Sequence, residues 1–147
     1  MKIDDAIKSR FSSSMHRAIV NVRYTSNYLA SSQNAFLSRF GLTMPQFNIL
    51  RILRGAEESI SVNTIKNRMV EKSPNTTRLM DKLIDKGLIT RERCSDDRRI
   101  VFVKISEGGL KLLADIDDQF NEEEFIPKTL SEEEAQQLSA LLDKLRG

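Results

Sequence analysis

Apolar residues recur at three- and four-residue intervals along most of the chain, a spacing typical of amphipathic helices that bury one face. The first stripe comprises Ile7, Phe11, Met15, Ile19, Val22 and Leu29. It predicts one long helix from about residue 7 to about residue 33. The serines at 12–14 and 31–32 are weak helix formers, so burial of the stripe has to stabilise this helix.

Capping signals predict three short helices after it. Thr43 and Gln46 have the spacing of a capping box around Pro45, and Gly55 is expected to end that helix. The caps expected for the next two helices are Ser61 and Ser73-Pro74, and Gly87 is the expected stop. The residues expected to face inward are Phe47, Leu50, Leu53, Ile65, Met69, Thr76, Leu79, Met80 and Leu83.

The pattern then changes to two strands, at 88–93 and 100–105, the second rich in β-branched and aromatic residues. The turn between them crowds two acids and two arginines at 96–99. Surface ion pairs contribute only about 0–1 kcal/mol, so this tip indicates contact with an external partner better than a stabilising device.

Two helices are expected to complete the chain. Ser106 caps the first, Pro127 breaks it, and Ser131 with Glu134 forms a capping box for the second. Their apolar stripes are Leu110, Leu113, Ile116 and Phe120, and Leu138, Leu141, Leu142 and Leu145. Because a small domain cannot cover these stripes and that of the first helix, we expect a homodimer built from the first, fifth and sixth helices.

The predicted fold is therefore mainly α with a small β-hairpin wing: a winged helix-turn-helix plus a helical dimerisation region. The 147 residues are read as a single protomer. Its winged helix-turn-helix spans residues 42–105, and residues 7–40 and 106–147 form the dimerisation region.

The net charge of +2 conceals an uneven distribution. Residues 66–99 hold ten lysines and arginines against six acids, whereas residues 106–147 hold four against eleven. A basic body with an acidic tail fits an anionic partner, although an ordinary solvated surface can have the same pattern. The single cysteine, the acidic start and the lack of a spanning apolar run predict a cytoplasmic protein without a membrane partner.

No catalytic constellation is visible, so we expect no enzymatic activity, no cofactor and no metal. His16 stands alone on its helix, without a second ligand at metal-binding spacing. Cys94 lies beside the charged turn, where arginines favour a thiolate, and it is either a redox switch or a bystander thiol.

Several local patterns, in this order and spacing, resemble the MarR family of bacterial transcription regulators over essentially the whole chain. They are Leu42-Thr43 with Gln46-Phe47, Thr77-Arg78-Leu79 through Gly87-Leu88-Ile89, Asp97-Arg98-Arg99, and Ile105-Ser106 with Gly109. The resemblance implies a homodimeric regulator, usually a repressor, that binds a pseudo-palindromic operator in double-stranded DNA and releases it on meeting a small aromatic ligand or an oxidant. Thr76 stands where the family is usually apolar, and Ile65-Lys66 replaces the usual Leu-Ala.

The predicted DNA contacts lie on the fourth helix and the wing. Arg78 is the candidate for a guanine edge, because a recognition helix meets bases with its N-terminal residues and arginine can bind O6 and N7 together. The resemblance implies that Arg99 enters the minor groove, and Asp97 is expected to orient an arginine. The other predicted DNA contacts are Ser73, Pro74, Asn75, Thr77, Lys82, Arg91, Arg93 and Arg98.

Two alternatives remain open at this point. Met15, Tyr24 and Tyr28 on the first helix either line a ligand pocket, as the resemblance allows, or pack in the core. A winged helix can also serve as a protein–protein adaptor without DNA binding, but the basic helix and wing favour DNA.

Overall fold

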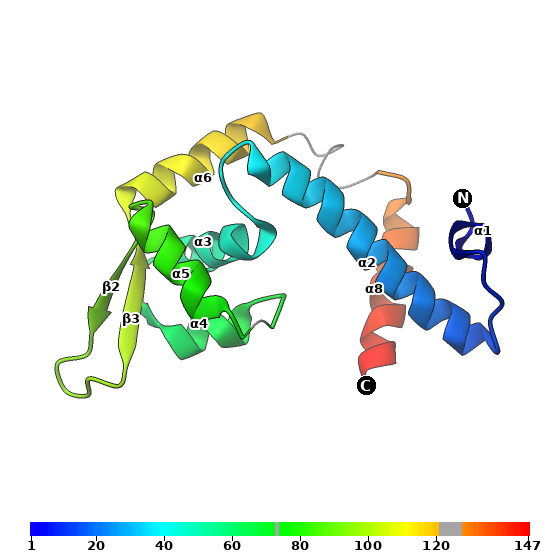
Figure 1. The fold of residues 1–147 in the computed structure, drawn as a ribbon, viewed down its shortest axis with the longest axis horizontal. Coiled ribbons are helices and arrows are strands. Elements are labelled where there is room, and N and C mark those ends of the chain that lie inside the picture. The colour runs from blue at the N-terminus through cyan, green and yellow to red at the C-terminus, as the bar shows by residue number, and fades with distance from the viewer. Residues whose placement is uncertain (73, 121–127) are drawn as a thin grey trace. The chain divides into compact units, whose positions relative to one another are not determined.

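The computed structural model describes residues 1–72, 74–120 and 128–147 (Figure 1). Its elements are α1 (Ile3–Ile7), α2 (Ser14–Ser38), α3 (Met44–Ala56), β1 (Ile60–Ser61), α4 (Val62–Arg68), α5 (Thr76–Asp85), β2 (Ile89–Arg93), β3 (Val101–Ile105), α6 (Glu107–Gln119) and α8 (Glu132–Arg146). Helices with one small antiparallel sheet confirm the predicted fold class.

The chain divides into two compact units. The terminal unit comprises residues 1–32 and 121–147, and the winged unit comprises residues 33–120. In the winged unit, α3 is the central element and contacts α4, α5, α6 and β3. Its buried residues Ile49, Leu50 and Leu53 form the middle of the core, because their spacing places all three on inward faces of the helix.

The sheet has three strands in the order β1–β3–β2, one more than the predicted hairpin. The extra strand β1 pairs Ile60 with Val103 and Ser61 with Phe102. With only two residues, β1 shows no alternating pattern that a sequence could display. Gly87 has a φ of 71° and turns the chain from α5 into β2, as its position predicted.

The prediction of one long first helix was wrong at its start. Lys8 adopts a left-handed conformation (φ 49°) and ends α1. The Oγ of Ser13 then accepts the backbone N–H of His16 at 3.0 Å and caps α2, which extends to Ser38. Capping by the serine run thus starts the predicted helix at Ser14 instead of about residue 7, and a separate short helix, α1, precedes it.

Three other boundary and burial predictions also need correction. Gly55 lies within α3, which ends at Glu57 in a left-handed conformation. Asn75 rather than Ser73-Pro74 precedes the first residue of α5; Ser73 itself, like Pro127, lies outside the described residues. Leu110 is 43% exposed, because the first turn of α6 presents Gly109 to the core instead.

The remaining caps agree with the prediction. Capping boxes are present at Thr43 with Gln46 and at Ser131 with Glu134, and Ser61 and Ser106 cap α4 and α6. Thr76, at a position that the resemblance makes apolar, is buried, and its hydroxyl donates to the sulfur of Met69 at 3.7 Å. The winged unit therefore accommodates this polar side chain without leaving it unsatisfied.

The long helices of the terminal unit keep apolar side chains exposed. Met15 and Tyr28 on α2 are 62% and 61% exposed, and Leu141 on α8 is 65% exposed. The suggestion that Met15, Tyr24 and Tyr28 pack in the core does not hold for the described protomer, because Tyr24 is 40% exposed and the other two are more exposed still. None of the helices within the described ranges combines the length and the apolar run that crossing a bilayer requires.

Candidate nucleic-acid interface

Helix α5 has one buried face and one exposed, polar face. Thr76, Met80 and Leu83 are buried against the winged unit. The predicted contact residues Pro74, Asn75, Thr77, Arg78 and Lys82 are exposed. Arg78 has no ion pair with the described residues, so its guanidinium is available to an external acceptor.

The turn before α5 is fixed by contacts from both neighbouring helices. The side-chain oxygen of Asn48 on α3 accepts the backbone N–H of Val70 at 2.9 Å. The ammonium group of Lys72 donates to the carbonyl oxygens of Lys66 and Asn67 at 3.3 and 2.8 Å, which caps the C-terminal end of α4. These bonds tie residues 70 and 72 to α3 and α4.

The wing is an ordered loop. The backbone N–H of Cys94 donates to Ile100 at 2.9 Å, and Arg93 donates through Nη1 to the carbonyl oxygen of Arg98 at 3.0 Å. Cys94 is half-buried at the base of this loop, whereas both arginines are exposed. Side-chain and backbone bonds thus close the loop that carries the predicted wing contacts.

Asp97 and Arg99 form a pair with two side-chain hydrogen bonds at the tip. One carboxylate oxygen of Asp97 accepts the backbone N–H of Arg99 at 3.0 Å and its Nε–H at 3.1 Å, and the other accepts Nη2–H at 3.2 Å. The side-chain bonds to Arg99 hold the pKa of Asp97 below its usual value, and the backbone bond adds to this effect. The Arg99 side chain is 91% exposed, so the pair orients the guanidinium without enclosing it.

A second pair joins the wing to the recognition helix. Arg91 on β2 donates to the carboxylate of Asp81 on α5 at 2.8 Å, with both side chains about half exposed. The sequence placed these residues on separate elements with no indication that they meet. Their contact fixes the wing relative to α5.

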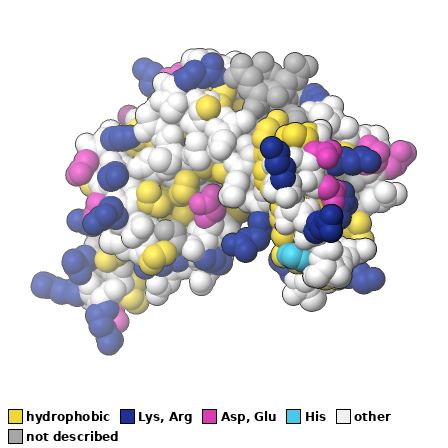
Figure 2. Space-filling model, turned by 45° about the vertical axis from the view of Figure 1, so that its right-hand side comes forward, with side chains coloured by type: hydrophobic (Ala, Val, Ile, Leu, Met, Phe, Trp, Pro, Cys, Tyr) yellow, Lys and Arg dark blue, Asp and Glu magenta, His cyan; other side chains and the backbone are white. Residues whose placement is uncertain are grey.

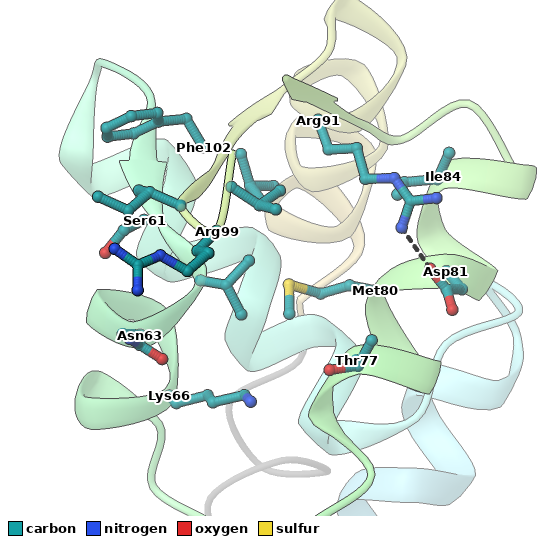
Figure 3. Close-up of a pocket in the computed structure, with 14 residues that line it drawn as sticks. Ser61, Asn63, Lys66, Thr77, Met80, Asp81, Ile84, Arg91, Arg99 and Phe102 are labelled. Atoms are coloured by element: carbon teal, nitrogen blue, oxygen red, sulfur yellow. Dashed lines mark hydrogen bonds and ion pairs between the residues drawn. The ribbon is translucent and has the colours of Figure 1, made fainter. Parts of the chain in front are cut away.

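Between α4, α5 and the strands lies a groove of about 590 Å³ (Figure 3). It brings together Thr77, Arg91 and Arg99 from the predicted set. The groove is also lined by three residues that the sequence analysis did not predict as DNA contacts, namely Ser61, Asn63 and Lys66. The helix-turn-helix geometry could have indicated them, because its first helix crosses the DNA backbone.

Lysine and arginine side chains gather at the wing end of the winged unit, at the lower left of Figure 2. Met15, Tyr24 and Tyr28 belong to the terminal unit and do not line the groove. In the described part of the chain, no three histidine, cysteine or carboxylate side chains cluster as metal ligands.

The chain is similar to known regulators over most of its length. A sequence model of the MarR family matches residues 42–101. The HTH-type transcriptional regulator MhqR of Bacillus subtilis (strain 168) is 30% identical over 113 residues, which are 76% of this chain and 77% of that protein.

Solved structures of other regulators are similar to this chain as well. MepR of S. aureus in a complex with DNA has a TM-score of 0.74 and 26% identity, covering 86% of this chain and 93% of that one. A mutant of MarR from E. coli, complexed with operator DNA, has a TM-score of 0.81 at 24% identity, covers 93% and 99% of the two chains, and supports the fold. From the extent of the match to MhqR and the shared architecture, we conclude that the chain belongs to the MarR family of DNA-binding transcription regulators.

Proposed function

We propose that this protein is a sequence-specific transcriptional repressor that binds a pseudo-palindromic operator as a homodimer. The observation that carries the proposal is the exposed Arg78 on α5, which has no ion pair with the described residues, beside a wing whose Arg99 is oriented by Asp97. A helix and a wing so arranged can read a major groove and the adjacent minor groove at once. MepR, a structural neighbour of the same family, forms a complex with DNA.

The dimer would use the exposed apolar faces of α2, α6 and α8. Leu138, Leu141 and Leu145 are 47%, 65% and 42% exposed on one helix, a density of apolar surface that favours association. A twofold dimer would place the two α5 helices about 34–36 Å apart, one turn of DNA.

Release by a small aromatic ligand or an oxidant completes the proposal. Met15, Tyr24 and Tyr28 present exposed aromatic and thioether surface on α2, which a second copy would help to enclose as a ligand pocket. Cys94 at the base of the wing is the thiol that an oxidant would reach. Such a regulator would act in the cytoplasm.

Selection of binding sites from random duplexes, with sedimentation of the complex, tests the proposal. We expect a palindromic consensus, two protomers per site and affinity that falls steeply with salt. A screen of aromatic ligands and peroxides against that complex then tests release. A stable monomer that ignored duplex DNA in dilute buffer would favour the adaptor function instead.

Replacing Arg99 by alanine should weaken binding most at operators with A·T-rich flanks, because narrow minor grooves concentrate negative potential. Asp97→Asn should give a smaller loss with the same flank dependence, since it keeps the side-chain shape but removes the charge that orients Arg99. Titration of matched A·T- and G·C-flanked duplexes measures both effects. An equal loss on both duplexes would contradict entry of Arg99 into the minor groove.

A further inference from the structure

The groove beside α5 is lined by three cationic side chains that differ in whether they form an ion pair. Arg91 is paired with Asp81 at 2.8 Å, and Arg99 is paired with Asp97 at 3.1 Å. Lys66 has neither an ion pair nor a side-chain hydrogen bond with any residue in the described ranges. Lys66 is therefore the cation of this groove whose charge the described chain leaves uncompensated.

The position of Lys66 is fixed by its own helix. The adjacent Ile65 is fully buried and anchors α4, while Lys72 caps the carbonyl oxygen of Lys66 itself. The Lys66 side chain is exposed and reaches from α4 toward Thr77 at the start of α5 (Figure 3). Asn63 precedes it by three residues, lines the same groove and is also exposed.

We propose that Lys66, with Asn63 beside it, binds a backbone phosphate of the duplex whose bases α5 contacts. The inference rests on the proposed DNA binding and adds a contact from α4 that the sequence did not assign. In a helix-turn-helix the first helix crosses the backbone next to the recognition helix, where Lys66 lies. A backbone phosphodiester would place a negative charge next to the ammonium group of Lys66.

The chemistry of lysine favours a phosphate over a base edge. An ammonium group is a compact point charge with rotating donors, and it lacks the planar fork with which arginine recognises guanine. Asp81, which lines the groove, is already engaged by Arg91, and Asp97 is engaged by Arg99. Lys66 should therefore contribute affinity and salt dependence without sequence preference.

The test is the salt dependence of Lys66→Ala on the selected operator and on an unrelated duplex. Each lost phosphate contact lowers the slope of log affinity against log salt by about 0.9, so a dimer should lose about 1.8. The ratio of wild-type affinity to Lys66→Ala affinity should therefore fall about twelvefold when the salt concentration rises from 50 to 200 mM. The fall should be equal on both duplexes. Lys66→Arg should restore the slope. Lys2→Ala, at an exposed lysine outside the predicted DNA-binding and dimerisation regions, is the matched control and should change nothing.

The outcomes distinguish failure of the Lys66 phosphate site from failure of the proposed DNA binding. An unchanged slope in Lys66→Ala, with wild-type operator selectivity, would overturn the phosphate site and leave DNA binding intact. A loss confined to the operator would assign Lys66 to base reading and overturn the inference as well. If the wild-type protein bound no duplex at any salt concentration, the proposed function itself would fail. Thermal unfolding of each variant verifies that it is folded.

Discussion

Arg78→Ala should lower operator affinity by about 1–3 kcal/mol for each half-site and should relax the base preference at one position of the half-site. The side chain is exposed on the outer face of α5 and has no ion pair with the described residues, so its loss removes an external contact with little effect on folding. In a symmetric dimer the loss occurs twice. Titration of a panel of duplexes, each with one substituted base pair, measures both affinity and preference.

Arg78→Lys provides the sharpest comparison for this prediction. It keeps the charge and the length but cannot bind O6 and N7 of guanine together, so affinity for unrelated DNA should remain while selectivity falls. Lys2→Ala again serves as the control. A uniform loss over the whole panel would show that Arg78 contacts phosphate and would contradict its role in base reading.

Local signals were sufficient to predict most of the winged unit. The capping box at Thr43, the serine caps at Ser61 and Ser106, and Gly87 act over four residues or fewer, so they can be read directly from the sequence. The β2–β3 hairpin followed from its composition. The three- and four-residue spacing of apolar positions also placed Arg78 and Thr77 on the exposed side of α5.

Features that depend on distant residues could not be predicted. The strand β1 exists because Ile60 and Ser61 pair with β3, some forty residues further along the chain. The contact between Asp81 and Arg91 and the location of Lys66 in the groove require the packing of α4, α5 and β2. The late start of α2 has a local cause instead: Ser13 caps the helix, and helical periodicity does not weigh such capping bonds against continued helix.

The arginine–aspartate pairs Arg91–Asp81 and Arg99–Asp97 of the candidate interface serve positioning more than stability. Both are substantially exposed, and exposed pairs contribute about 0–1 kcal/mol to folding. One fixes the wing against α5 and the other fixes Arg99 within the wing. Groups held in place before binding lose less conformational entropy on binding, so these pairs favour recognition of a rigid duplex.

Gly109→Ala should destabilise the protein by about 3 kcal/mol, the upper end of the usual cost of overpacking. A β-carbon there would lie 2.3 Å from the carbonyl oxygen of Leu88 and 2.6 Å from Cγ1 of Ile105. The Leu88 carbonyl oxygen accepts the backbone N–H of Ser106 at 3.0 Å, so it cannot withdraw without breaking that bond. Thermal unfolding at fixed protein concentration should show a midpoint lowered by about 10 °C.

Gly55→Ala is the matched control, because it makes the same chemical change in α3 with no atom within 4 Å of the new methyl group. Alanine in a helix interior is about 0.5–1 kcal/mol more favourable than glycine, so this variant should be slightly more stable than the wild type. Opposite signs for the two variants would attribute the loss at Gly109 to the close approach of α6 to Leu88. Equal midpoints for the two variants would contradict the close packing of Gly109 against Leu88 and Ile105. They would also contradict the role of this packing in holding the start of α6 close to β2.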